Sequence, residues 1–300
     1  MNETAKKALK IILKIAVSIA AIAFVVSKID LESTKETLLS AKISYLLLAL
    51  VVYTVSQMLS AMRINSLFVT IPLKLDTFMN MRLYWLGMFY NFFLPGGVGG
   101  DGYKIYYLKK HYKQSAKELF TYLFSDRLSG LVIICCYLVL FVSFFVVNLP
   151  IPYKEWAILL LPLGLAAYYL FLWIFKRTAL KAYWKVVGYS FVIQGLQMCA
   201  ACLILYSLGE TNNFDSYMFL FFMSSIASAI PIGLPGGIGL REMTFVIGSQ
   251  YLGTQEGVAV SLSVLFYTVS LFSSLPGAIF AMKTSLIEGK GNGGETEIAS

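Results

Sequence analysis

Long apolar runs separated by short polar connections dominate the pattern of this chain. A run of about 20 apolar residues is long enough to cross a bilayer as a helix. The pattern predicts six transmembrane helices, at about 11–29, 43–68, 120–147, 156–175, 186–208 and 258–282. Two further apolar stretches, which begin at Thr77 and at Tyr217, contain glycine-rich breaks, and we expect both to be re-entrant broken segments. The expected fold class is an all-α membrane protein.

The two breaks have similar sequences. Leu94-Pro-Gly-Gly-Val-Gly-Gly-Asp101 has a near copy in Leu234-Pro-Gly-Gly-Ile-Gly-Leu-Arg241. Proline removes a backbone donor and glycine resists helix formation, so both sequences predict broken helices. Broken backbone at membrane depth is tolerated where protein buries it or where it lines a water-filled cavity. Two such breaks in one membrane protein suggest a transport pathway.

The breaks are related by a fixed offset, because Pro235 follows Pro95 at an offset of 140 (235 − 95). At the same offset Gln57 corresponds to Gln197, and the apolar helix around 45–68 corresponds to the one around 185–208. These matches predict a duplicated unit. At the matching position the first break carries Asp101 and the second carries Arg241, so the charge is reversed.

The duplication defines the predicted domain organisation. We expect one transmembrane domain over 1–300, with one repeat unit at about 43–147, a second at about 183–287 and a disordered tail at 288–300. A single additional span, at about 156–175, separates the units. The second unit is therefore expected to be inverted relative to the first, a plan that recurs among transporters with discontinuous helices.

Composition and charge agree with a membrane location. With 58% hydrophobic and only 13% charged residues, and a mean hydropathy of +0.73, the chain does not resemble a soluble globular domain, in which about 25% of residues are charged. The net charge of +8 comes from cations clustered in short loops, which indicates membrane topology and anionic headgroups and not nucleic acid. The positive-inside rule places both termini in the cytoplasm, and we interpret Arg63 as marking the cytoplasmic end of its span.

No catalytic or metal-binding constellation is recognisable in the sequence. Cys199 and Cys202 have CxxC spacing inside an apolar helix, but no further ligands lie nearby. The single histidine, His111, has no matching acid and serine pattern. The glycine-rich breaks lack the preceding strand and the Lys-Ser/Thr ending of a phosphate-binding loop. We therefore expect no metal, no cofactor and no enzymatic activity.

Charged and polar residues at the breaks and inside the spans are the candidate substrate-binding residues. A charge at the bilayer centre costs about 2.5–3.5 kcal/mol on insertion scales, so a retained charge usually faces a partner or a cavity. A half-helix that begins after each break would direct its free N–H groups and positive dipole end at a phosphate or carboxylate. The candidates are Asp101, Arg241, Glu242, Arg82, Asn91, Gly96, Gly97, Gly236, Gly237, Asp126 and Arg127.

The roles of several candidates stay open at this point. Arg241 matches phosphate geometry, and Asp101 either pairs with Arg241 in the empty site or binds a cationic headgroup. Alternatively, Arg241 and Glu242 satisfy each other near the surface. Arg82 either lines the cavity, as Asn91 would, or extends to the cytoplasmic headgroups.

Asp126 and Arg127 have two interpretations as well. They either face the cavity or form an ion pair at the interface. Ser129 and Gly130, which follow them, are small enough to let another helix approach closely.

Three motifs in this order resemble the flippase-like transmembrane region of lysylphosphatidylglycerol synthetases and of their stand-alone relatives. The motifs are Pro95-Gly-Gly-Val-Gly-Gly-Asp101, Asp126-Arg-Leu-Ser-Gly130 and Pro235-Gly-Gly-Ile-Gly-Leu-Arg-Glu242. The resemblance covers about 10–285. It implies a protein of the bacterial or archaeal cytoplasmic membrane that moves an amphiphilic lipid between leaflets.

The resemblance also bounds the activity and the cargo. Members of the family that are fused to a soluble aminoacyl-transferase domain make aminoacylated phospholipid, and because these residues contain no such domain, we do not expect that synthetase activity. The implied partners are membrane lipids, namely an anionic phospholipid, an aminoacyl-phospholipid or a polyprenyl-phosphate-linked sugar. The sequence makes no prediction of the oligomeric state.

The main hypothesis is therefore a lipid flippase-like transporter in the cell membrane. The alternative from another class is a membrane-embedded transferase that modifies a lipid headgroup, with Asp101 or Asp126 as its acid or base. A third interpretation is an assembly subunit whose cavity is vestigial.

Overall fold

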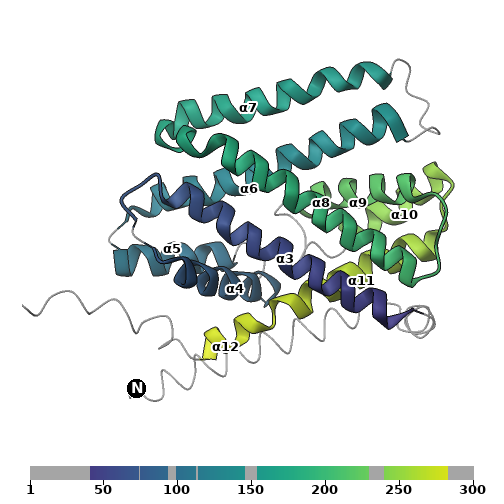
Figure 1. Ribbon diagram of the computed structural model, residues 1–300, viewed down its shortest axis with the longest axis horizontal. Coiled ribbons are helices and arrows are strands. Elements are labelled where there is room, and N and C mark those ends of the chain that lie inside the picture. Colours follow the sequence, from purple (N-terminus) through teal and green to yellow (C-terminus); the bar gives the residue numbers. More distant parts are fainter. Residues whose placement is uncertain are drawn as a thin grey trace, which may run out of the picture.

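All regular structure in the described part of the chain is helical. The computed structural model describes residues 41–73, 75–93, 99–112, 114–145, 154–229 and 240–282 (Figure 1). Within these ranges, five helices are long and apolar enough to cross a membrane: Ile43–Phe68, Ala116–Phe144, Trp156–Phe175, Arg177–Ser207 and Glu256–Ser274. They coincide with five of the six expected spans and confirm an all-α membrane protein. The first expected span, at about 11–29, and the tail at 288–300 lie outside the described residues.

The elements follow one another in chain order from α3 to α12. They are α3 (Ile43–Phe68), α4 (Thr77–Phe93), α5 (Gly99–Tyr112), α6 (Ala116–Leu140), the π-helical turn η2 (Phe141–Phe145), the 3-10 helix η3 (Lys154–Leu159), α7 (Leu160–Phe175), the 3-10 helix η4 (Arg177–Ala182), α8 (Tyr183–Ser207), α9 (Phe214–Ala229), α10 (Leu240–Leu252), α11 (Glu256–Ser274) and α12 (Pro276–Met282). The first residues of α3 and α8 are separated by the same offset as the two breaks, and so are the first residues of α6 and α11. These bounds agree with a duplicated unit, and the duplication stays a prediction.

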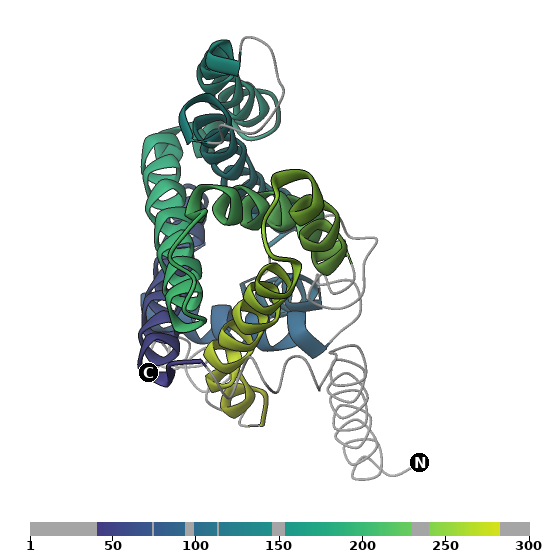
Figure 2. The same ribbon diagram turned by 90° about the vertical axis from the view of Figure 1, so that its right-hand side faces the viewer.

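Helices α3 and α8 pack side by side and run antiparallel (Figures 1 and 2). At one end the backbone N–H of Lys42 donates to the carbonyl oxygen of Ser207 at 3.0 Å. Towards the other end Nη1 of Arg63 donates to Oγ of Ser190, also at 3.0 Å. The helices that correspond under the predicted offset therefore have opposite directions, as an inverted repeat requires.

The helices on the two sides of each break pack against each other. Helix α4 contacts α5, and α9 contacts α10. A Cβ atom at Gly100 would overlap the carbonyl oxygen of Gly87, so α4 and α5 approach at backbone distance. None of these four helices is among the five candidate spans. Residues 94–98 and 230–239, which include Gly96, Gly97, Gly236 and Gly237, lie outside the described residues, so re-entrant geometry stays a prediction.

The last predicted span differs from the structure. The range 258–282 was expected to be one helix, but α11 ends at Ser274 and α12 begins at Pro276. Proline has no N–H to continue the helix and is favoured at a first helical position, which explains the break. The following Gly277 lies against α4, where an added Cβ would overlap the carbonyl oxygen of Trp85. The indole of Trp85 in turn donates to the carbonyl oxygen of Ser273 at 3.0 Å.

Buried apolar side chains form two clusters. The first lies mainly between α8, α9 and α11, with Ile204, Phe222 and Leu262 fully buried. The second lies between the end of α3 and α4, α5, α6 and α7, with Leu67 and Leu172 fully buried. Most of the charged residues described below lie beside the second cluster. The apolar packing of this cluster positions the helices that carry them.

Gly100→Ala tests the close contact of α4 with α5. We expect a loss of stability of about 1–3 kcal/mol, since overpacking a tight contact costs about that much. The measurement is thermal unfolding of the purified protein in detergent. Gly102→Ala is the matched control on the same helix, because a Cβ there would meet nothing within 4 Å. Equal destabilisation by both variants would contradict the contact.

Candidate functional site

A buried ion pair joins two of the transmembrane helices. Arg63 of α3 donates from Nε to Oδ1 of Asp126 on α6 at 2.8 Å, and from Nη2 to Oδ2 at 3.0 Å. The residues are only 7% and 8% exposed. Two parallel N–H···O bonds between ionised groups are the strongest arrangement that these side chains adopt. The geometry therefore fixes both the distance between α3 and α6 and their relative rotation.

A third helix contributes to the same pair. Nη1 of Arg63 donates to the hydroxyl of Ser190 on α8, and this hydroxyl lies 3.0 Å from that of Ser129 on α6. A Cβ at Gly130 would lie 3.2 Å from Nη1 of Arg63, so the guanidinium passes close over this glycine. Ser129 and Gly130 thus lie against side chains of α3 and α8, and close approach of a neighbouring helix backbone at this point stays a prediction.

The ion pair overturns one interpretation from the sequence. Asp126 and Arg127 were considered as a mutual pair at the interface, but Asp126 is buried and binds Arg63. Arg63 was interpreted as marking the cytoplasmic end of its span, and this orientation stays a prediction; the structure adds that the Arg63 side chain is buried and has a partner. The available signal was the position of Arg63 within an apolar run, because a charge retained there usually has a partner.

Asp101 is the centre of a second charged group at the start of α5. Its carboxylate pairs with Nε of Arg127 on α6 and lies 3.6 Å from Nζ of Lys104. Among the described residues these are its ion-pair partners, whereas the sequence analysis considered Arg241. The structure thus places Asp101 and Arg127 together, with Asp126 one position away along α6.

Lys104 connects the charged residues with the aromatic ones. Its ammonium group lies 4.4 Å from the ring centroid of Tyr84 on α4. Burial lowers the pKa of the Lys104 ammonium group, while the negative charges of Asp101 and Asp126 raise it. The hydroxyl of Tyr84 donates to Oε1 of Gln57 on α3 at 3.2 Å. Neither Lys104 nor Tyr84 was among the candidate residues predicted from the sequence.

Polar residues of α4 have structural partners. Oδ1 of Asn91 accepts the backbone N–H of Gly100 at 2.9 Å, so one donor at the start of α5 that was expected to face a ligand is already bound. Asn80 is 4% exposed and donates to the carbonyl oxygen of Ala61 at 2.7 Å. Arg82 lies on the same helix and is partly buried.

Arg241 lies in a different environment in the second half of the chain. It is in the first turn of α10, it is 7% exposed, and its guanidinium lies 4.9 Å from the ring centroid of Phe266 on α11. Phe266 packs edge to face with Tyr53 of α3 at 5.3 Å. A desolvated guanidinium over an aromatic ring gains about 2 kcal/mol or more. Glu242 follows within α10, and its side chain lies outside the described residues.

These observations define a multi-pass helical membrane protein in which a buried ion pair joins helices α3 and α6. The chain belongs to the family described as the lysylphosphatidylglycerol synthase TM region, whose model matches residues 11–182 and 174–277. It is also similar to the UPF0104 membrane protein PH1989 of Pyrococcus horikoshii, with 23% identity over 311 residues, which cover 84% of this chain and 91% of that protein. The resemblance recognised from the three motifs is confirmed.

The ion pair is tested by removing one partner and then both. We expect Arg63→Met alone to cost about 3–5 kcal/mol, because it leaves the Asp126 charge buried without compensation. The double variant R63M/D126L should recover most of this loss, since a pair of similar apolar volume is often neutral or stabilising. Thermal unfolding in detergent measures both.

Arg177→Met serves as the control for these variants, because Arg177 is exposed. Its change in stability should stay within about 0.5 kcal/mol. The single variant Asp126→Leu is measured in the same way. A double variant whose loss of stability equals the sum of the losses in Arg63→Met and Asp126→Leu would show that the two charges do not stabilise each other.

Proposed function

We propose that this protein is a lipid flippase-like transporter of the cell membrane, with its lysine-rich loops in the cytoplasm. A polar headgroup would cross between the two broken segments while the acyl chains stay in the bilayer. Moving a charged headgroup through hydrocarbon is very costly, and a polar route through the protein lowers this barrier. The family name supports the proposal, because it refers to an aminoacylated phospholipid.

One observation carries the proposal: the two helices that follow the breaks, α5 and α10, have charges of opposite sign in their first turns. Asp101 is in the first turn of α5 and Arg241 is in the first turn of α10. The Arg241 guanidinium is buried and lies over the ring of Phe266, and taking a charge out of water is costly. We infer that Arg241 binds the phosphate of the headgroup.

The acidic group fits the other end of such a headgroup. Asp101 is held by Arg127 and by the longer contact to Lys104 at 3.6 Å. An ammonium group on a headgroup would compete with Lys104 for the same carboxylate, because both are compact cations with several donors. A lipid that carries both a phosphate and an ammonium group would then interact with both halves of the protein. The proposed repeat units would alternately open this route to each leaflet.

Arg241→Ala tests the proposed phosphate contact. Purified protein is reconstituted into vesicles that contain a headgroup-labelled anionic phospholipid, and the exchange of label between leaflets is followed by chemical quenching of the outer leaflet. We expect the protein-dependent rate to fall at least about tenfold in this variant, since loss of a charge-assisted hydrogen bond costs about 1.5–3 kcal/mol. The rate of Arg241→Lys should lie between those of Arg241→Ala and the wild type, because lysine keeps the positive charge but lacks the planar fork of donors.

Arg177→Ala provides a matched loss of one arginine at an exposed position and should leave the rate unchanged. A wild-type rate equal to that of protein-free vesicles would refute transport. Chromatography of lipids extracted after the assay separates transport from the alternative transferase activity. A transporter leaves the headgroup chemically unchanged, whereas a transferase yields a new lipid species.

A further inference from the structure

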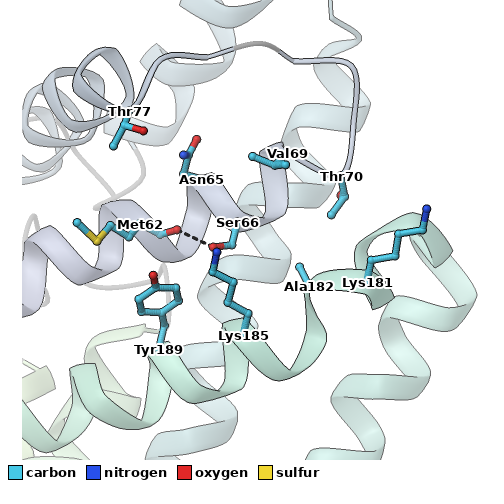
Figure 3. A pocket seen from close by; sticks show the side chains of 10 residues that line it. All are labelled: Met62, Asn65, Ser66, Val69, Thr70, Thr77, Lys181, Ala182, Lys185 and Tyr189. Carbon is cyan, nitrogen blue, oxygen red and sulfur yellow. Dashed lines mark hydrogen bonds between the residues drawn. The ribbon is translucent and has the colours of Figure 1, made fainter.

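A groove with a cavity volume of about 490 Å³ lies between the end of α3, the start of α4, η4 and the start of α8 (Figure 3). This volume is within the range of roughly 300–1,000 Å³ that is typical of small-molecule sites. The polar side chains that line it include Asn65, Ser66, Thr70, Lys181, Lys185 and Tyr189. None of them belongs to the charged groups around Asp126, Asp101 or Arg241.

The interior of the groove is rich in hydrogen-bond acceptors. The hydroxyl of Ser66 donates to the carbonyl oxygen of Met62 at 2.9 Å, and that of Thr70 donates to the carbonyl oxygen of Leu67 at 2.7 Å. Both hydroxyl oxygens therefore keep lone pairs for an incoming donor. Oδ1 of Asn65 is buried and has no hydrogen-bond partner within the described part of the chain. A ligand with hydroxyl donors would satisfy these oxygens.

The mouth of the groove is cationic. Lys181 and Lys185 are exposed, and neither has an acidic partner within salt-bridge distance among the residues that the structure describes. Figure 3 shows Lys185 extending from α8 towards Ser66, with Tyr189 one turn further along the helix. Lysine binds phosphate as a point charge, so this mouth favours an anionic group.

One side of the groove continues into an apolar surface. Met62 of α3 and Val69, which directly follows this helix, line the groove and are 38% and 71% exposed. The same face of α3 carries a row of exposed apolar residues: Leu47, Val51, Val55, Met58 and Met62. Their spacing of three or four residues keeps them on one side of the helix, over about 22 Å at about 1.5 Å per residue. The face is apolar up to Met62 and becomes polar at Ser66, inside the groove.

We propose that this groove binds, from the membrane, an anionic phospholipid whose headgroup carries free hydroxyl groups. The phosphate lies at Lys181 and Lys185, the headgroup hydroxyls donate to Asn65, Ser66 and Thr70, and an acyl chain follows the exposed face of α3. The exposed apolar row favours a lipid, because an acyl chain can pack along it. A soluble phosphate compound would make no contact with that surface. This site goes beyond the proposed transport, because it needs no contact with Arg241 or Asp101.

The test is lipid binding by the purified full-length protein in detergent, measured by native mass spectrometry. The probes are phosphatidylglycerol, phosphatidic acid, which lacks headgroup hydroxyls, phosphatidylcholine, and inorganic phosphate. We expect phosphatidylglycerol to bind most tightly. The double variant K181Q/K185Q should weaken its binding about 30-fold, since each cation near an anionic lipid contributes about fivefold. Asn65→Leu should reduce the preference for phosphatidylglycerol over phosphatidic acid.

The matched control is K109Q/K110Q, which removes two exposed lysines on α5 outside the groove. It should leave lipid binding within about twofold of the wild type. Equal weakening by both double variants would overturn the site, as it would show nonspecific attraction to cationic loops. Binding of inorganic phosphate as tight as that of the lipid would overturn the lipid assignment. Thermal unfolding of every variant verifies that it is folded.

The leaflet exchange assay separates this proposal from the proposed function. Loss of binding in K181Q/K185Q with an unchanged exchange rate supports a lipid site apart from the transport route. Binding that is abolished by Arg241→Ala would place the lipid at the central charges and overturn the groove. Specific binding at the groove in a protein that exchanges no lipid would refute transport alone.

Discussion

A guanidinium and a carboxylate buried in an apolar helix bundle are stable only together, and this constraint organises the structure. Arg63 and Asp126 lie on helices that are far apart in the sequence, and their two short hydrogen bonds hold α3 against α6. Ser190 extends the same contact to α8. Removing either charge costs about 3–5 kcal/mol, whereas replacing both by apolar groups is often harmless. The pair therefore adds little to the net stability of the fold. Its main effect is to require one arrangement of the three helices, because either charge is costly without the other.

The two halves handle buried charge by different means. At the predicted offset between the repeat units, Arg63 and Asp126 correspond to Leu203 and Phe266, so the second half has no equivalent of this ion pair. Phe266 instead lies under the guanidinium of Arg241. At these two positions the first predicted unit therefore has a hydrogen-bonded ion pair, and the second has an apolar residue and an aromatic ring.

The sequence predicted the described spans well because each is a long apolar run, and periodicity and length suffice for such elements. It failed at Pro276, where an apolar run conceals a break between α11 and α12. Asp101, Asp126 and Arg127 were identified as candidates, but their partners were not, since a partner depends on which helix faces meet. Arg63 was attributed to topology alone, because lysine and arginine near span ends usually report membrane orientation.

The contacts of Asp101 bear on how the proposed transport route would accept the ammonium group of a lipid headgroup. Arg127 is partly exposed and binds the carboxylate closely, while Lys104 is buried and lies 3.6 Å away, beyond an ordinary hydrogen bond. Burial disfavours the charged form of Lys104, and the nearby carboxylates favour it. A guest ammonium at this place would replace the Lys104 ammonium beside the carboxylate, and the local charge would stay the same if Lys104 released its proton. Such an exchange avoids exposing a bare carboxylate to the apolar interior, which is the costly step in any route for a charged headgroup.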